Sequence, residues 1–252
     1  FLGEVLSGLS AKVFRTFYAS EAVESKLKST PLKAEDPDYV KKYVATIANL
    51  EAATVCNHRR TIPKTWRLSL RKNENRLREL IKRSKNTQER TRMKFEEKNE
   101  DWKRKIRKQK DRLEDMKQRL EAYKEQIAEK RQIGEPVTTL RRRVAVVRRA
   151  VTQQKDGVKD LLKRYEEQMS KLKERLETQR QREVKRIEKT RFQVKTKRET
   201  RDYNLGTSLK SYIDPRIYFR WGREVGYDWK LYYPRALQKK FSWVETGLNK
   251  PT

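Results

Sequence analysis

Hydrophobic positions in the middle of the chain recur at alternating spacings of four and three residues. The pattern runs through Trp102, Ile106, Gln109, Leu113, Met116, Leu120, Tyr123 and Ile127, of which Gln109 is polar. This alternation is the a/d pattern of a heptad repeat, which buries one narrow stripe of a helix against a partner helix. It predicts a long helix that packs lengthwise on another helix.

The same alternation returns after a strong turn signal, Gly-Glu-Pro at 134–136. Its members are Leu140, Val144, Val147, Val151, Gln154, Val158, Leu161 and Tyr165, and a shifted stripe continues through Leu172, Leu176 and Ile187. Equal seams on both sides of a short turn favour an antiparallel hairpin over two separate rods. We therefore expect residues 65–199 to form an antiparallel coiled coil.

The two flanking segments have a different composition. Residues 1–64 are those of an ordinary folded domain, with a helical apolar pattern and a break at Ile62-Pro63, and residues 200–252 are rich in aromatic residues and turn formers. A segment of about fifty residues is marginal alone. We expect 200–252 to be a small helical domain that docks on 1–64, which makes the chain all-α in three parts.

The charge of the chain is strongly positive and points to a polyanionic partner. Lys and Arg number 65 against 35 Asp and Glu, for a formal net charge of +30. Such a field attracts phosphates and releases their counterions on binding. DNA, RNA and an anionic membrane surface would all satisfy it, so charge alone does not identify the partner.

The sequence also argues against several classes of protein. No run of about eighteen apolar residues is present, so no segment is expected to span a bilayer. The opening Phe1-Leu2-Gly3 lacks the features of a secretory signal, so we expect an intracellular protein, and we expect no membrane among its partners. With one cysteine, Cys56, and one histidine, His58, the chain offers neither an internal disulfide nor a metal cluster. We expect no cofactor and no protein-bound metal.

Three residues in separate segments suggest chemistry: Arg15, His58 and Tyr212. Each alone has an ordinary structural explanation. Together they suit metal-free phosphodiester transesterification, because a tyrosine oxygen can form a phosphotyrosyl bond that keeps the energy of the broken strand. Arg and His can stabilise the negative charge that gathers on the non-bridging oxygens in the transition state.

The segments around these residues resemble the eukaryotic-type DNA topoisomerase I family, type IB. They are Lys-Val-Phe-Arg-Thr at 12–16, Cys-Asn-His at 56–58 followed by Pro-Lys-Thr at 63–65, and Tyr-Ile-Asp-Pro-Arg at 212–216. Their order, with a charged coiled-coil linker between the second and the third, is also similar to that of the family. The resemblance implies that 1–64 is the end of a helical catalytic core, 65–199 the linker and 200–252 the domain carrying the nucleophilic tyrosine.

The resemblance implies roles for individual residues. Tyr212 would be the nucleophile that becomes linked to a 3′ phosphate, and Arg15 and His58 would stabilise the scissile phosphate. The family's other catalytic Arg, and the Lys that protonates the leaving 5′ oxygen, lie upstream of this chain. We therefore expect the chain to be inactive alone.

The resemblance also implies partners and a place in the cell. The partners would be duplex DNA and an upstream core region, on the same polypeptide or as a separate subunit, in an enzyme that acts as a monomer. Such an enzyme would be chromosome-associated, in the nucleus of a eukaryote or in the cytoplasm or nucleoid of an archaeon.

Two departures from the family pattern lie next to the tyrosine. Ser211 stands where the family usually has Asn, and Leu209-Lys210 reverses the common order. Because that Asn is associated with the camptothecin site, the resemblance implies reduced sensitivity to such inhibitors.

Two other functions are compatible with parts of the pattern. A tyrosine recombinase shares the Tyr, Arg and His chemistry but does not explain the long coiled coil before the tyrosine or the motif at 212–216. A non-enzymatic, nucleic-acid-binding coiled-coil scaffold explains the heptads and the charge but leaves the three short segments unexplained. Loss of the Tyr212 hydroxyl would not affect a scaffold.

Overall fold

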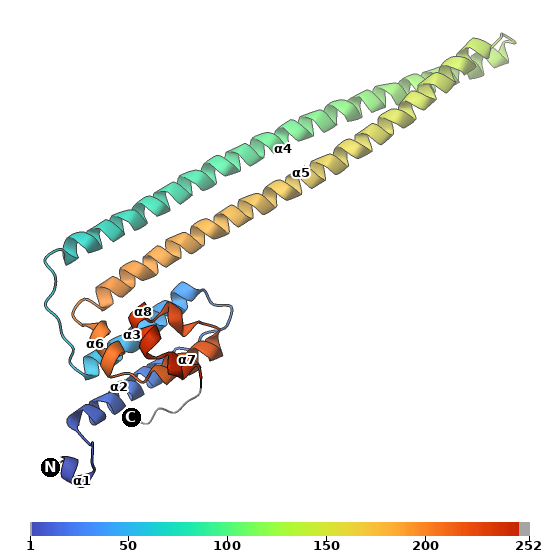
Figure 1. Ribbon diagram of the computed structural model, residues 1–252. Coiled ribbons are helices and arrows are strands. Elements are labelled where there is room, and N and C mark those ends of the chain that lie inside the picture. The colour runs from blue at the N-terminus through green and yellow to red at the C-terminus, as the bar shows by residue number, and fades with distance from the viewer. Residues whose placement is uncertain (1, 247–252) are drawn as a thin grey trace. The chain divides into compact units, whose positions relative to one another are not determined.

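The structure is a computed structural model that describes residues 2–246; Phe1 and 247–252, at the outer ends of the predicted parts 1–64 and 200–252, lie outside it. Figure 1 shows the order of the elements. They are α1 (Leu2–Val5), α2 (Ala11–Lys28), α3 (Asp38–Val55), α4 (Trp66–Gln132), α5 (Thr138–Glu199), α6 (Leu205–Ser211), α7 (Pro215–Val225), the 3-10 turn η1 (Trp229–Leu231), α8 (Arg235–Lys240) and the 3-10 turn η2 (Ser242–Val244). Every regular element within 2–246 is helical, which confirms the all-α class.

The chain divides into two compact units. One joins 1–81 with 184–252, and the other is 82–183. The long helices α4 and α5 contribute to both units. The predicted part boundaries at 64/65 and 199/200 differ from this division and remain predictions, since compactness alone does not define a domain.

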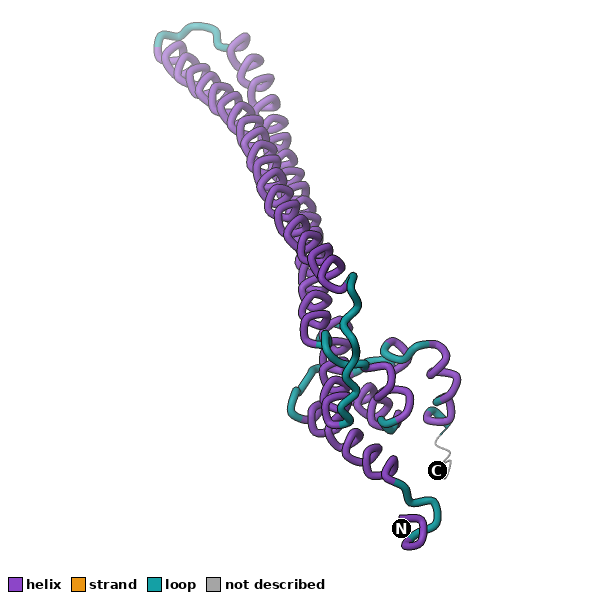
Figure 2. The backbone as a smooth tube through the Cα atoms, turned by 90° about the vertical axis from the view of Figure 1, so that its left-hand side faces the viewer, coloured by secondary structure: helices purple, strands orange, loops and turns teal. Residues whose placement is uncertain are grey.

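The unit 82–183 is a two-helix antiparallel hairpin, and Figure 2 shows its helices side by side. Ile106, Leu120 and Val158 of the predicted seams are buried, as is Met169. Polar seam residues pair across the hairpin: Gln154 donates to the side chain of Gln109 at 2.7 Å. These contacts confirm the predicted hairpin.

The turn of the hairpin lies where the sequence predicts it. Gln132 is the last residue of α4 and Thr138 the first of α5. Gly134 has φ +78°, a left-handed conformation that costs glycine nothing, and the N–H of Glu135 closes the end of α4 by donating to Lys130 O at 2.9 Å.

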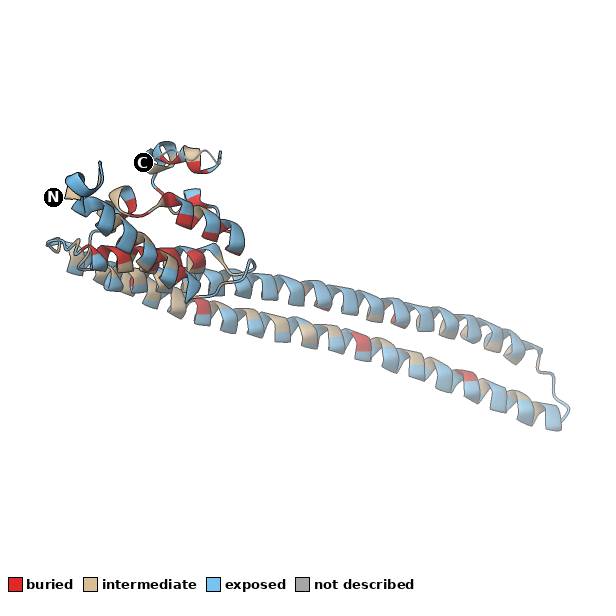
Figure 3. Ribbon diagram, turned by 90° about the horizontal axis from the view of Figure 1, so that it is seen from below, coloured by how far each residue is buried: buried red, intermediate tan, exposed pale blue. Residues whose placement is uncertain are grey.

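The other unit has a single core built from α2, α3 and the C-terminal helices. Figure 3 shows buried residues concentrated in these short helices and sparse along α4 and α5. The buried face of α3 is made mostly of small residues, among them Ala45, Ala48 and Ala52, which let neighbouring helices approach closely.

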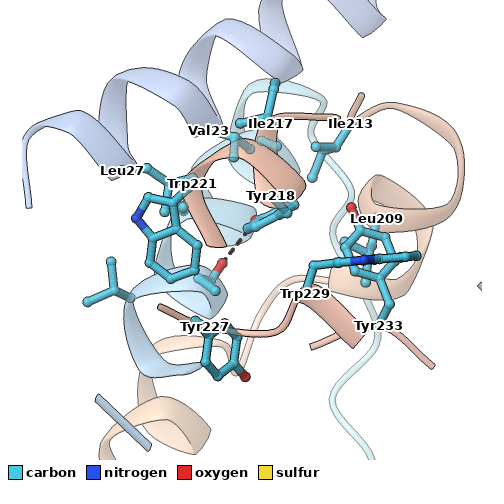
Figure 4. Packing of buried hydrophobic residues seen from close by; sticks show 14 of the residues in the cluster. Val23, Leu27, Leu209, Ile213, Ile217, Tyr218, Trp221, Tyr227, Trp229 and Tyr233 are labelled. Carbon is cyan, nitrogen blue, oxygen red and sulfur yellow. Dashed lines mark hydrogen bonds between the residues drawn. The ribbon is translucent and has the colours of Figure 1, made fainter. Parts of the chain in front are cut away.

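Aromatic side chains of the C-terminal segment fill this core (Figure 4). Tyr218 is 1% exposed, and its hydroxyl donates to Ala45 O at 3.0 Å. Val23 and Leu27 of α2 belong to the same buried cluster as Ile217 and Trp221 of α7. The shared cluster confirms that the C-terminal segment docks on the first part of the chain.

Candidate active site

The Cys-Asn-His segment at 56–58 terminates α3. Asn57 has φ +51°, and its N–H donates to Thr54 O at 2.9 Å, while the N–H of His58 donates to Ala53 O at 2.8 Å. This pair of bonds around one left-handed residue is a Schellman motif, and Asn tolerates that conformation better than most residues. The motif places His58 directly beyond the end of α3.

Backbone hydrogen bonds join His58 to the start of α6. The N–H of Asn204 donates to His58 O at 2.8 Å, and the N–H of Arg60 donates to Asp202 O at 3.0 Å. Between them Arg59 and Tyr203 form an isolated antiparallel bridge. Asn204 is also the N-cap of α6, where its side chain accepts from the N–H of Gly206 at 3.1 Å. The position of α6 is therefore tied to that of His58.

Tyr212 lies at the corner between α6 and α7. It is the C-cap of α6, and its N–H donates to Ser208 O at 3.0 Å. Asp214 is the N-cap of α7, where its carboxylate accepts from the N–H of Arg216 at 2.9 Å, and Pro215 holds the first helical position. The Tyr-Ile-Asp-Pro-Arg motif thus encodes a sharp corner between two helices, because Asp and Pro are favoured where a helix begins.

The structure brings together all three residues that the sequence singles out. The ring centroids of His58 and Tyr212 are 4.8 Å apart, and the Arg15 guanidinium carbon lies 5.3 Å from the Tyr212 ring centroid. The Arg15 guanidinium also donates to the carbonyl of Cys56. Arg15 is exposed, while His58 and Tyr212 are half-buried. The cluster combines a phenol, a permanent cation and an imidazole at one accessible place.

The surroundings of His58 favour its neutral form. Burial lowers the pKa of His58 from its ordinary value, and the positive charge of Arg15 lowers it further. Its Nδ1 atom is buried and has no hydrogen-bond partner among residues 2–246. The imidazole can therefore act as an uncharged hydrogen-bond donor near neutral pH.

Cys56, next to the cluster, has a structural role. Its side chain is 2% exposed, and its Sγ donates to Arg15 O at 3.8 Å. Burial raises the pKa of the Cys56 thiol, and Arg15 only partly opposes this rise. The thiol stays protonated and packs Arg15 against the end of α3.

One contact of the cluster has no signal in the sequence. Ser20 of α2 makes hydrogen bonds to the backbone on both sides of Ile213, and serine on a helix has many ordinary uses. Lys12 lies on the same helix and is exposed.

Two family models match the chain, one at each end. The model described as eukaryotic DNA topoisomerase I, catalytic core, matches residues 1–93, which include Arg15 and His58. The model described as the C-terminal topoisomerase domain matches residues 184–250, which include Tyr212.

Curated relatives match over nearly the whole chain. The chain is 28% identical over 267 residues to DNA topoisomerase 1 of Candidozyma auris, covering 96% of this chain and 34% of that protein. It is 25% identical over 244 residues to the mitochondrial DNA topoisomerase I of Homo sapiens, covering 96% of the chain and 30% of that protein. It is 26% identical over 245 residues to human DNA topoisomerase 1, covering 96% of the chain and 23% of that protein. The chain thus spans about a third or less of the length of these relatives.

Proposed function

Because this chain belongs to the eukaryotic-type DNA topoisomerase I family, we propose that it supplies the nucleophilic part of a type IB topoisomerase active site. The complete enzyme would relax supercoiled duplex DNA by breaking one strand, allowing rotation and resealing the strand. The observation that carries this proposal is the packing of Arg15 and His58 around the Tyr212 ring, since the three residues come from distant segments of the sequence.

In the proposed reaction, the Tyr212 hydroxyl oxygen attacks the scissile phosphorus. The phenolic proton passes to solvent as the phosphorus–oxygen bond to tyrosine forms. The bond to the 5′ oxygen breaks, and that oxygen leaves as a hydroxyl after receiving a proton from the upstream Lys. The strand is then held as a 3′-phosphotyrosyl ester. Religation is the reverse attack by the 5′ hydroxyl. No phosphodiester bond is hydrolysed, so the tyrosyl ester keeps the energy of the broken bond and resealing needs no ATP.

Arg15 and His58 would stabilise the transition state of this transfer. Arg15 carries a permanent positive charge and a planar set of donors that matches two phosphate oxygens. The Nδ1 atom of His58 is buried, so its Nε2 is the nitrogen left to donate to a phosphate oxygen. Neutral His58 adds a hydrogen-bond donor to the site. It does not place a second positive charge beside the Arg15 guanidinium.

An upstream core region would complete the site, on the same polypeptide or as a separate subunit. Several large apolar side chains near the start of the chain are exposed in residues 2–246: Val5, Leu6, Val13, Phe14, Phe17 and Tyr18. Four of them, Val13, Phe14, Phe17 and Tyr18, lie on α2, and exposed apolar surface of this kind marks an interaction site. Its position on the helix that carries Arg15 supports a further protein part next to the site.

The antiparallel hairpin would lie near the duplex downstream of the break. Its exposed Lys and Arg residues would attract DNA phosphates and slow the rotation of the free strand, without taking part in the chemistry. The enzyme would act as a monomer on chromosomal DNA with little sequence preference, because phosphate contacts carry little base information. No helix within residues 2–246 is both long enough and apolar enough to cross a membrane.

Relaxation of a supercoiled plasmid tests the proposal. The chain would be assayed together with the upstream core, without ATP and with EDTA, as wild type, as Tyr212→Phe and as the matched control Tyr203→Phe. We expect relaxation by the wild type and by the control, and none by Tyr212→Phe. Binding of DNA by all three proteins without relaxation would instead favour the scaffold, and synapsis with strand exchange would favour a recombinase.

A further inference from the structure

A side chain of α2 reaches the backbone corner that carries Tyr212. The Ser20 hydroxyl donates to the carbonyl of Tyr212 at 3.4 Å and accepts from the N–H of Asp214 at 3.1 Å. Ser20 is half-buried, and the two groups that it contacts flank the buried residue Ile213. One hydroxyl therefore spans the corner between α6 and α7.

Both backbone groups depend on a partner from outside their own helix. The carbonyl of Tyr212 follows the last turn of α6, and the N–H of Asp214 precedes the first turn of α7, so neither has an intrahelical partner. Ser20 satisfies one group from each helix. It thereby joins the end of α6 to the start of α7.

Ser20 lies beside buried positions of α2. Its neighbours on α2, Ala19 and Val23, are fully buried in the same cluster as Ile213 and Ile217. The helix α2 also carries Arg15, five residues earlier, whose guanidinium lies over the Tyr212 ring. One helix thus contacts both the side chain and the backbone of the tyrosine.

We infer that Ser20 is a positioning residue that sets the placement of the Tyr212 hydroxyl relative to Arg15 and His58. This inference rests on the proposed function, because it assigns Ser20 a role through the nucleophile. Ser20 does not touch the reacting atoms. It acts by holding the backbone from which the nucleophile projects, and transfer reactions lose rate steeply when a reacting atom is misplaced.

Single-turnover cleavage of a nicked oligonucleotide duplex by the complete enzyme tests the role. Loss of both hydrogen bonds of the Ser20 hydroxyl to the backbone corner should slow cleavage by Ser20→Ala about tenfold. The affinity for DNA should stay unchanged, because the phosphate-binding side chains remain. Ser25→Ala, an exposed serine on the same helix, should cleave at the wild-type rate.

A second pair of variants separates the hydroxyl from the space that it fills. Ser20→Thr keeps the hydroxyl, and Ser20→Val has nearly the same shape as the threonine variant but lacks the hydroxyl. We expect Thr to cleave faster than Val, and this pair also decides the matter if Ser20→Ala does not fold. Hydrogen exchange of the Asp214 amide should speed up in Ser20→Val and not in Ser20→Thr.

The outcomes distinguish this inference from the proposed function. If the wild type forms the tyrosyl adduct but Ser20→Ala and Ser20→Val cleave as fast, the positioning role is wrong and the proposed function stands. Equal losses in Thr and Val would also overturn the role, because the hydroxyl would then not be the cause. If the wild type forms no adduct, the proposed function itself fails.

Discussion

Asn57 is the non-glycine residue with a positive φ among residues 2–246. Its left-handed conformation costs most residues roughly 1–2 kcal/mol but costs glycine nothing. We expect Asn57→Ala to lower the free energy of unfolding by roughly 1 kcal/mol, and Asn57→Gly to leave it nearly unchanged. Chemical denaturation of the two variants measures the difference. Equal stabilities would show that the Schellman motif does not require a left-handed residue there.

The titration of His58 can be predicted and measured without overlap, because it is the single histidine of the chain. Its NMR titration reports one group, and the midpoint should lie below the ordinary value of 6.5, since burial and Arg15 both lower its pKa. Arg15→Gln should raise the midpoint. A midpoint at or above the ordinary value in the wild type would contradict the packing of the cluster.

The same lowered pKa has a consequence for stability. The unfolded chain binds the His58 proton more tightly than the folded chain does, so stability is complete above the unfolded value of 6.5 and declines as the pH falls through it. Between pH 7.5 and 5.5, we expect wild type to lose more stability than His58→Gln does. Thermal melts at the two pH values make the comparison.

At this scale, the sequence predicts candidate residues for the chemistry but not those that would hold them in place. Arg15, His58 and Tyr212 are recognisable because their types and flanking motifs suit one reaction. Ser20 is not, because its effect depends on a contact between residues more than 190 positions apart. The role of Asn57 depends on a dihedral angle that the segment alone does not reveal.

Among the elements, the hairpin was the most predictable, because its periodicity is local and extends over many turns. The turn at 134–136 and the buried seam positions Ile106, Leu120 and Val158 were predicted from the sequence, whereas the buried Met169 was not among the predicted positions. The bridge between Arg59 and Tyr203 could not be predicted, since two residues of extended backbone carry no pattern. That short bridge nevertheless ties α6 to His58.

Two helical glycines should respond oppositely to substitution by alanine. A Cβ at Gly222 would lie 2.3 Å from the carbonyl oxygen of Tyr227, whose N–H donates to Gly222 O at 2.7 Å, whereas a Cβ at Gly157 would meet nothing within 4 Å. We expect Gly222→Ala to destabilise the protein by about 1–3 kcal/mol through overpacking. Gly157→Ala should stabilise α5 by roughly 1 kcal/mol. Calorimetric unfolding distinguishes them, and a stable Gly222→Ala variant would contradict the close approach.

At the scale of the whole molecule, the structure groups residues that the sequence separates. The first part of α4, up to residue 81, and the last part of α5, from residue 184, belong to the same compact unit as the candidate site. Residues 82–183 form the other unit. Composition changes near 64 and 199, whereas packing changes near 81 and 183, because a helix continues through each boundary. Composition therefore could not locate the packing boundaries.

Deletion of Asn73 to Arg198 tests the division of labour between the long helices α4 and α5 and the rest of the chain. The deletion leaves Arg15, His58 and Tyr212 in place, so the complete enzyme should still cleave DNA. The relaxation rate should change, and binding should depend less steeply on salt because fewer phosphate contacts release counterions. Plasmid relaxation and DNA binding over a range of salt concentrations measure both effects. Loss of all cleavage would show that the hairpin is part of the catalytic machinery.

The most direct measurement is the identity of the covalent link between protein and DNA. The complete enzyme would be trapped on a labelled duplex with EDTA present and then digested, and the DNA-bound peptide would be identified by mass spectrometry. The account predicts a peptide containing Tyr212 joined to a 3′ phosphate, and no adduct from Tyr212→Phe. An adduct at another residue, a link to a 5′ phosphate, or an undiminished adduct in Tyr212→Phe would contradict it.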